Sequence, residues 1–171
     1  MQKITDWQTN PRGEIGIASD HGGFELKKQI AAFLAETGFT PVDFGPFELD
    51  PADDYPDFGS PMAKAVSKGE LASGILLCRS GVGMGIDANR FHNVRAVVAY
   101  SAKVAKASRE HNVSNVLVIP ADYLDFEAIK EIILTWVSTP FSNDRRHINR
   151  LEKLERQSYD DIAAVRSADP E

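Results

Sequence analysis

The chain alternates short apolar runs with segments of helical periodicity, and the alternation repeats five times without a pattern typical of a β-hairpin. Runs such as GILLC at 74–78 are apolar without interruption, which is typical of strands covered by helices on both faces. The pattern therefore predicts the α/β class, with a doubly wound, Rossmann-like sheet of five parallel strands and helices on both faces. The predicted strands are 14–19, 39–44, 74–78, 94–100 and 115–120.

The segments between these runs have the apolar period of helices that cover a sheet. Gly38 ends the first helix, and Pro61 marks the start of the second, because proline is favoured at the first helical position. The last helix is highly charged and has few apolar residues, which fits a helix that reaches a partner subunit. The predicted helices are 24–37, 61–68, a short helix after 85, 102–109, 126–138 and 143–156.

The length of 171 residues fits one domain, and the sequence contains neither an internal repeat nor a linker. We therefore predict a single domain over 1–171, with a core of about 14–154 and a frayed tail at 157–171.

Composition and charge exclude several classes of protein. A net charge of −6 and a pI near 5.2 argue against a nucleic-acid partner, which requires a basic face. The single cysteine, Cys78, excludes an internal disulfide and predicts a reducing, cytoplasmic environment. Residues 1–13 lack the apolar run of a signal peptide, and no stretch is long enough to span a membrane. The four histidines lack the close spacing of metal ligands, so neither a metal nor another cofactor is expected.

The most informative segment is the turn after the third predicted strand, Cys78-Arg79-Ser80-Gly81-Val82-Gly83-Met84-Gly85. Glycines at alternate positions allow backbone N–H groups to point at an anion, although such turns also serve close packing. A dinucleotide-binding fingerprint is excluded because Ile86 stands where its third glycine belongs. A cysteine-dependent phosphatase loop is excluded because Met84 stands where its arginine belongs.

Cys78 ends an apolar strand beside these N–H groups. A nearby helix N-terminus lowers the pKa of a thiol from its usual value of about 8.5, which would make a reactive thiolate accessible. The alternative is a packing role, which is common for a cysteine at the end of a buried strand.

Three other polar segments allow both a structural and a functional interpretation. Asp20 and His21 follow the first strand and either cap the next helix or contact a ligand. The pair His111 and Asn112 ends a helix, as a cap or as a ligand contact. Further along, two arginines one turn apart on the last helix form either a phosphate clamp or an ordinary solvated face. These two arginines are Arg146 and Arg150.

Taken together, these segments resemble ribose-5-phosphate isomerase B and its relatives, the galactose-6-phosphate isomerase subunits. The resemblance extends from about residue 14 to about residue 154. It is carried by SDHGGFELK from Ser19, DYP at 54–56, GILLCRSGVGMGIDANR at 74–90, REHN at 109–112, NVL at 115–117 and RRHINR at 145–150. Several motifs in the same order make the resemblance more specific than any one of them.

The resemblance implies an aldose–ketose isomerase that needs no metal and passes through a cis-enediolate. Cys78 would be the base, because Met84 stands where some family members have a glutamate. The enediolate oxygen would be stabilised by the Ser80 hydroxyl and by the backbone amides of the turn. The implied amides are those of Ser80, Gly81, Val82, Gly83, Met84 and Gly85.

The resemblance also implies roles outside this turn. His111 would protonate the ring oxygen during ring opening, since an imidazole pKa near 6.5 suits that step. Asp20 would hold or transfer protons of the substrate hydroxyls, and Asn112 would bind the sugar. The phosphate would be held by His21, Arg146 and Arg150, with Tyr55 lining the pocket. The family implies a homodimer or a dimer of dimers with shared active sites, in which His111, Asn112 and the two arginines enter the partner's pocket.

Two positions depart from the family pattern. Arg79 stands where a glycine is common, and Asp122 stands where a phosphate-binding arginine is common. We expect compensation, in which Arg79 supplies the charge that Asp122 withdraws, by pairing with Asp122 or with the phosphate. Ribose 5-phosphate is the default substrate, while galactose, allose or tetrose phosphates remain alternatives. A non-catalytic sugar-phosphate-binding subunit and a nucleotide- or flavin-binding module are alternatives from other classes.

Overall fold

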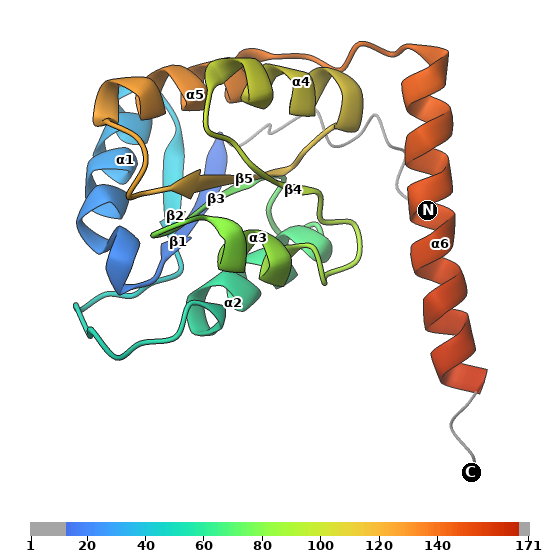
Figure 1. The fold of residues 1–171 in the computed structure, drawn as a ribbon, viewed down its shortest axis with the longest axis horizontal. Coiled ribbons are helices and arrows are strands. Elements are labelled where there is room, and N and C mark those ends of the chain that lie inside the picture. The colour runs from blue at the N-terminus through green and yellow to red at the C-terminus, as the bar shows by residue number, and fades with distance from the viewer. Residues whose placement is uncertain (1–12, 168–171) are drawn as a thin grey trace.

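The protein forms a five-stranded, fully parallel sheet with helices on both faces (Figure 1), as the sequence predicts. The structure is a computed structural model that describes residues 13–167 and the side chains of residues 13–156; the remaining ends of the predicted domain lie outside this range. The strands lie in the order β2-β1-β3-β5-β4. Their bounds are β1 Glu14–Ser19, β2 Thr40–Asp43, β3 Gly74–Cys78, β4 Ala96–Val98 and β5 Val116–Pro120.

The helices divide between the two faces of the sheet. Helices α1, α4 and α5 cover one face, α2 and α3 cover the other, and α6 stands apart along one side (Figure 1). The bounds are α1 Phe24–Glu36, α2 Pro56–Ser67, α3 Val82–Ala88, α4 Ala102–Asn112, α5 Phe126–Ser138 and α6 Arg145–Ser167. Within residues 13–167, no helix combines the length and the apolar character that crossing a membrane requires.

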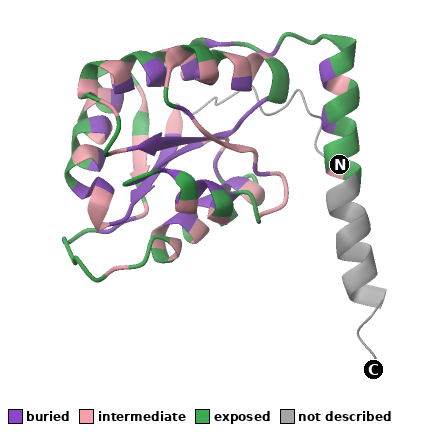
Figure 2. Cartoon of the chain, viewed as in Figure 1, coloured by how far each residue is buried: buried purple, intermediate pink, exposed green. Residues whose placement is uncertain are grey.

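Side chains of alternate residues in the buried strands pack into two separate cores, one on each face of the sheet. In β3, Ile75 and Leu77 pack with the helices of the α1 face, whereas Leu76 and Cys78 pack with α2 and α3. Strands β1, β3 and β5 are buried almost throughout (Figure 2), which explains their uninterrupted apolar sequence. The thiol that ends β3 is thereby directed to the face that α2 and α3 cover.

Several boundaries differ from the sequence prediction. Helix α2 begins at Pro56, so the proline at its first position is Pro56, and Pro61 lies inside the helix. Helix α3 begins at Val82, within the segment predicted as a turn. Strand β4 is shorter than predicted, while α4 extends to Asn112 and α6 continues to Ser167, past the predicted start of the frayed tail.

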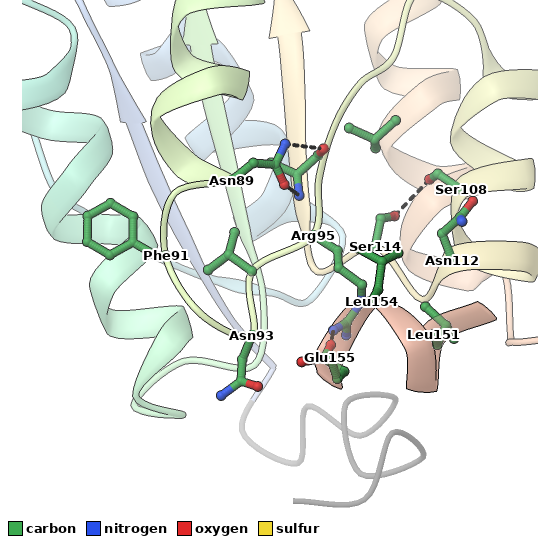
Figure 3. Close-up of a pocket in the computed structure, with 13 residues that line it drawn as sticks. Asn89, Phe91, Asn93, Arg95, Ser108, Asn112, Ser114, Leu151, Leu154 and Glu155 are labelled. Carbon is green, nitrogen blue, oxygen red and sulfur yellow. Dashed lines mark hydrogen bonds and ion pairs between the residues drawn. The ribbon is translucent and has the colours of Figure 1, made fainter. Parts of the chain in front are cut away.

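A hollow of about 410 Å³ lies where α6 meets the body of the domain (Figure 3). It is lined by the segment 89–97, the end of α4 and the first turns of α6, and Asn112 is among its walls. Leu151 of α6 is buried beside it and packs with Val113 and Phe141. The first half of α6 is therefore docked on the domain by a small apolar cluster.

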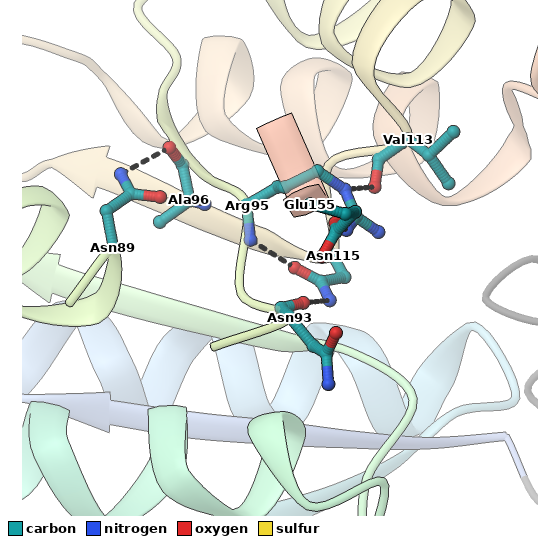
Figure 4. Close-up of polar contacts among 7 residues, drawn as sticks. All are labelled: Asn89, Asn93, Arg95, Ala96, Val113, Asn115 and Glu155. Atoms are coloured by element: carbon teal, nitrogen blue, oxygen red, sulfur yellow. Dashed lines mark hydrogen bonds and ion pairs between the residues drawn. The ribbon is translucent and has the colours of Figure 1, made fainter. Parts of the chain in front are cut away.

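Polar contacts around Arg95 complete this docking (Figure 4). The Arg95 guanidinium donates to the Val113 carbonyl at 3.0 Å and to the Glu155 carboxylate of α6 at 2.9 Å. The Asn115 amide accepts from the Arg95 backbone N–H at 2.7 Å and donates to the Asn93 carbonyl at 2.8 Å. Burial lowers the pKa of Arg95, and Glu155 counteracts this effect by stabilising the charged form.

We predict that Glu155→Gln destabilises the fold by about 1–3 kcal/mol, because the buried Arg95 guanidinium keeps its charge but loses the carboxylate that pairs with it. Urea unfolding measures the loss. Glu152→Gln, on the exposed side of α6, is the matched control and is expected to change stability by less than about 0.5 kcal/mol. Equal stability of both variants would show that the Arg95 contact does not anchor α6.

Candidate active site

Three turns meet at the edge of the sheet where the parallel strands end. Backbone hydrogen bonds join them: the Asp20 N–H donates to the Leu77 carbonyl at 3.3 Å, and the Ala121 N–H donates to the Cys78 carbonyl at 3.0 Å. The residues after β1, β3 and β5 are therefore held side by side. This is the edge at which ligands bind in doubly wound folds.

Cys78 is almost fully buried at the end of β3, and its sulfur has a defined donor. The Gly81 N–H donates to the Cys78 Sγ at 3.1 Å, which fixes the position of the sulfur against the turn. Gly81 adopts a left-handed conformation with φ of 76°, which glycine tolerates without strain. A Cβ at Gly81 would also lie 2.9 Å from Val98 Cγ1, so the turn requires glycine on both grounds.

The structure distinguishes among the amides that the sequence assigns to an anion. Gly81 donates to the Cys78 sulfur, Val82 donates to the Ser80 hydroxyl at 3.3 Å, and Gly85 donates to the Gly81 carbonyl at 3.0 Å. Among the described residues, the amides of Ser80, Gly83 and Met84 have no hydrogen-bond acceptor. These three amides are therefore the donors of this segment that have no competing acceptor within the described part of the chain.

The Gly83 and Met84 positions are shaped by α2. The Tyr55 ring lies against Gly83, where an added Cβ would be 2.9 Å from the ring. The Met84 side chain is fully buried beneath Gly59, so it packs in the core and does not line a ligand site. Tyr55 is partly exposed and lies against the turn at Gly83.

Asp20 is buried beside the Cys78 turn. Its Oδ1 accepts from the Gly23 N–H at 3.2 Å, so it caps the short 3-10 turn His21–Gly23, the structural role considered from the sequence. Burial raises the pKa of this carboxyl, while His21 and the nearby N–H groups partly offset the increase. A buried carboxyl with a raised pKa can both hold and release a proton near the sugar hydroxyls.

His21 is oriented by Asp53, a residue that sequence patterns did not single out. Asp53 Oδ1 lies 2.6 Å from His21 Nδ1 and also accepts from the His21 backbone N–H at 3.0 Å. This hydrogen bond is the main cause of a raised pKa for His21. Asp53 lies in an irregular loop 32 residues away, beside the DYP motif at 54–56, and nothing in its local pattern distinguishes it from neighbouring Asp50 and Asp54.

Arg79 and Asp122 are paired, as one form of the expected compensation requires. The Arg79 Nε donates to Asp122 Oδ2 at 2.9 Å, across the gap between the turns after β3 and β5. The Arg79 side chain also occupies the space that a Cβ at Gly22 would take. Arg79 therefore lies at the rim of the site beside His21.

The remaining predicted residues lie at the opposite edge of the sheet. Helix α4 starts beyond the end of β4 and returns over about 16 Å, so its last residues, His111 and Asn112, lie near the start of β5. Arg146 and Arg150 are exposed on α6, which stands on that same side (Figure 1). One chain therefore does not bring these four residues to Cys78.

His111 packs against His147, with ring centroids 4.4 Å apart and the rings tilted by 41°. His147 is buried, and its Nδ1 lies 2.9 Å from the Ser142 hydroxyl. Burial and the neighbouring His111 lower the pKa of His147, which favours its neutral form. The second half of the predicted site is thus an ordered group at the junction of α4 and α6.

Among the residues that the structure describes, no group of three His, Cys, Asp or Glu side chains is placed to hold a metal ion.

We predict that Asp53→Asn lowers the pKa of His21, because the amide cannot stabilise the imidazolium as a carboxylate does. The raised pKa stabilises the folded protein fully below the ordinary value of 6.5, and this stabilisation is lost as the pH rises through the raised value. NMR titration of the His21 ring measures the change. Asp54→Asn, at the exposed neighbouring position, is the control, and equal shifts in both variants would contradict the assignment.

Comparison with known proteins identifies the family. A sequence model described as Ribose/Galactose Isomerase matches residues 15–154. Ribose-5-phosphate isomerase B of Escherichia coli (strain K12) is 38% identical over 141 residues, which cover 82% of this chain and 93% of that protein. The corresponding protein of Mycolicibacterium paratuberculosis is 37% identical over 140 residues, which cover 82% of this chain and 88% of that protein.

Solved structures give the same result. Ribose-5-phosphate isomerase B of Clostridium thermocellum superimposes with a TM-score of 0.82 at 38% identity, covering 86% of this chain and 98% of that one. The Mycoplasma genitalium enzyme, solved with bound ribulose 5-phosphate, gives a TM-score of 0.82 at 36% identity, covering 85% of this chain and 96% of that one. With its sheet order, its strand-end cysteine and these similarities over almost the whole domain, the chain belongs to the Ribose/Galactose Isomerase family.

Proposed function

We propose that this protein is a metal-independent isomerase that interconverts an aldose phosphate and its ketose, with ribose 5-phosphate and ribulose 5-phosphate as the default pair. The observation that carries the proposal is the buried Cys78 sulfur, which accepts the Gly81 N–H beside the Asp20 carboxyl. Family membership and the ribulose 5-phosphate bound by the Mycoplasma genitalium relative support the substrate class.

In the proposed reaction, the Cys78 thiolate removes the proton on C2 of the open-chain aldose, and the negative charge moves onto the C1 carbonyl oxygen, which then receives the proton of the C2 hydroxyl. The resulting cis-enediolate is stabilised by the Ser80 hydroxyl and by the Gly83 and Met84 amides, which have no other acceptor among the described residues. The Cys78 thiol then returns the proton to C1 while the oxygen on C2 becomes the ketone. The net change is a proton shift from C2 to C1 and from O2 to O1.

Asp20 is suited to move the proton between the two oxygens. Burial raises its pKa, so the carboxyl exchanges a proton more readily near neutral pH than an exposed aspartate does. Its position after β1, next to the β3 turn, places it beside the proposed base.

The proposed site is completed by a second copy of the chain. The proposed residues that lie at the edge opposite Cys78 are His111, Asn112, Arg146 and Arg150. His111 would assist ring opening, Asn112 would bind the sugar, and the two arginines would bind the phosphate. A homodimer, or a dimer of dimers, in which these residues enter the pocket of the partner would unite both halves. On the Cys78 side, His21 would add to the phosphate site and Tyr55 would line it.

Another sugar phosphate is the second candidate substrate. The paired Arg79 and Asp122 stand at the rim of the pocket, where a changed charge pattern alters which sugar phosphate fits. The proposed location is the cytoplasm, because Cys78 is a free cysteine and the mechanism requires it to be reduced.

We predict that the purified protein isomerises ribose 5-phosphate in the presence of a chelator and that Cys78→Ala lowers kcat by about 10²–10⁴-fold, the usual contribution of a general base. Formation of ribulose 5-phosphate measures the rate, and circular dichroism checks that the variant is folded. Full activity of Cys78→Ala would rule out this base. An inactive wild type would redirect the assay to four- and six-carbon sugar phosphates.

We also predict that Cys78→Ala and His111→Ala chains, each nearly inactive, regain about a quarter of wild-type activity when they are mixed and allowed to exchange subunits. Half of the dimers are then mixed, and each mixed dimer has one site with both residues intact. Native mass spectrometry of the mixture demonstrates exchange, and wild-type chains mixed with either variant are the control, because their activity per wild-type chain is expected to stay unchanged. No recovery despite demonstrated exchange would mean that the active sites are not shared.

A further inference from the structure

The edge of the sheet that carries Cys78 is acidic within one chain. The turns after the five strands comprise residues 20–23, 44–55, 79–81, 99–101 and 121–125, all of which the structure describes. Their acidic residues are Asp20, Glu48, Asp50, Asp53, Asp54, Asp122 and Asp125. Arg79 is the one arginine or lysine in these turns. Lys27 also reaches the loop after β2, but its Nζ donates to Asp43 and to the Pro46 carbonyl.

Two contacts fix the base of the Arg79 side chain. Its aliphatic part covers Gly22, where an added Cβ would collide with Arg79 Cγ, and its Nε donates to Asp122 Oδ2 at 2.9 Å. The bond to Asp122 uses only Nε. Among the described residues, neither terminal nitrogen of Arg79 has an acceptor, and 67% of the side chain is exposed. The two terminal nitrogens are thus oriented by the bond at Nε and are available for a two-point contact with an anion.

Arg79 faces the same space as His21. Its aliphatic carbons lie against Gly22, the residue next to His21, and its charge partly offsets the raised pKa of His21. His21 is in turn held by Asp53 from the loop after β2. Arg79 and His21 therefore stand side by side at the rim, each positioned by an aspartate from a different turn.

We propose that Arg79 is a specificity-determining residue that binds the phosphate monoester of the substrate through its two terminal nitrogens, and that Asp122 is the positioning residue that orients it through Nε. The inference rests on the proposed function for the identity of the substrate. It adds a phosphate contact from the chain that carries Cys78, distinct from the α6 arginines that a second copy would supply. Selectivity for phosphorylated over free sugars then depends on the turn after β3.

The alternative is a surface ion pair with no ligand, since exposed pairs contribute little to stability. The two interpretations predict different relative effects of substituting Arg79 and substituting Asp122. If the pair is only structural, Arg79→Ala changes phosphate binding no more than Asp122→Asn does. If Arg79 contacts the phosphate, its removal is far more damaging than that of Asp122.

The test measures the dissociation constant of inorganic phosphate by calorimetry and the KM for ribose 5-phosphate in the same variants. We predict that Arg79→Ala weakens phosphate binding and raises KM by about ten- to hundredfold, the value of a lost charge-assisted contact, with kcat within about threefold. Arg79→Lys keeps the charge without the two-point geometry, so its phosphate affinity and its KM are expected to lie between those of Arg79→Ala and those of the wild type. Asp122→Asn keeps an oxygen acceptor for Nε and is expected to stay within about threefold of wild type.

Lys103→Ala is the control for charge alone, because it removes one exposed positive charge on the first turn of α4 and should change either constant by less than about twofold. Equal effects of Arg79→Ala and Asp122→Asn, an Arg79→Ala variant within twofold of wild type, or a wild type that does not bind phosphate would each overturn the inference. A wild type that fails to isomerise but binds phosphate through Arg79 would instead overturn the proposed function and support the inference.

Discussion

The parallel pairing of β1, β3 and β5 is the constraint on which the rest of the structure depends. Because all three strands are buried on both faces, their carboxyl ends and the turns that follow are held together at one edge. Backbone hydrogen bonds between the turns, such as Asp20 N–H to the Leu77 carbonyl, fix their spacing. The thiol of Cys78, the carboxyl of Asp20 and the ring of His21 meet at this edge for that reason alone.

The same constraint separates the predicted site into two halves. Each helix that leaves the carboxyl edge must return across the sheet before the next parallel strand can begin. His111 and Asn112 therefore end α4 at the far edge, and α6 continues from there, anchored by Leu151 and by the bond from Arg95 to Glu155. A site that needs residues from both edges requires a second chain, which is the physical basis of the proposed shared active sites.

Charge at the carboxyl edge is controlled by pairs that join different turns. Asp53 orients His21 and raises its pKa, and Asp122 orients Arg79. Each aspartate uses one oxygen to orient a basic side chain at the rim, so the acidic loops of the chain position the groups that could bind an anion. The net acidity of the protein is thus compatible with a phosphorylated substrate.

The sequence by itself determined the alternation of strands and helices, the buried character of β3, and the position of Cys78 at a strand end, because these depend on local periodicity. The order of the motifs along the chain was also sufficient to identify the family. Only the tertiary structure decided that Asp53 pairs with His21 across 32 residues, that Met84 is buried under Gly59, and that α2 begins at Pro56. It also decided that Gly81 and Gly85 amides are already bonded within the chain. These features depend on contacts between segments distant in the chain, which local patterns of residue type do not encode.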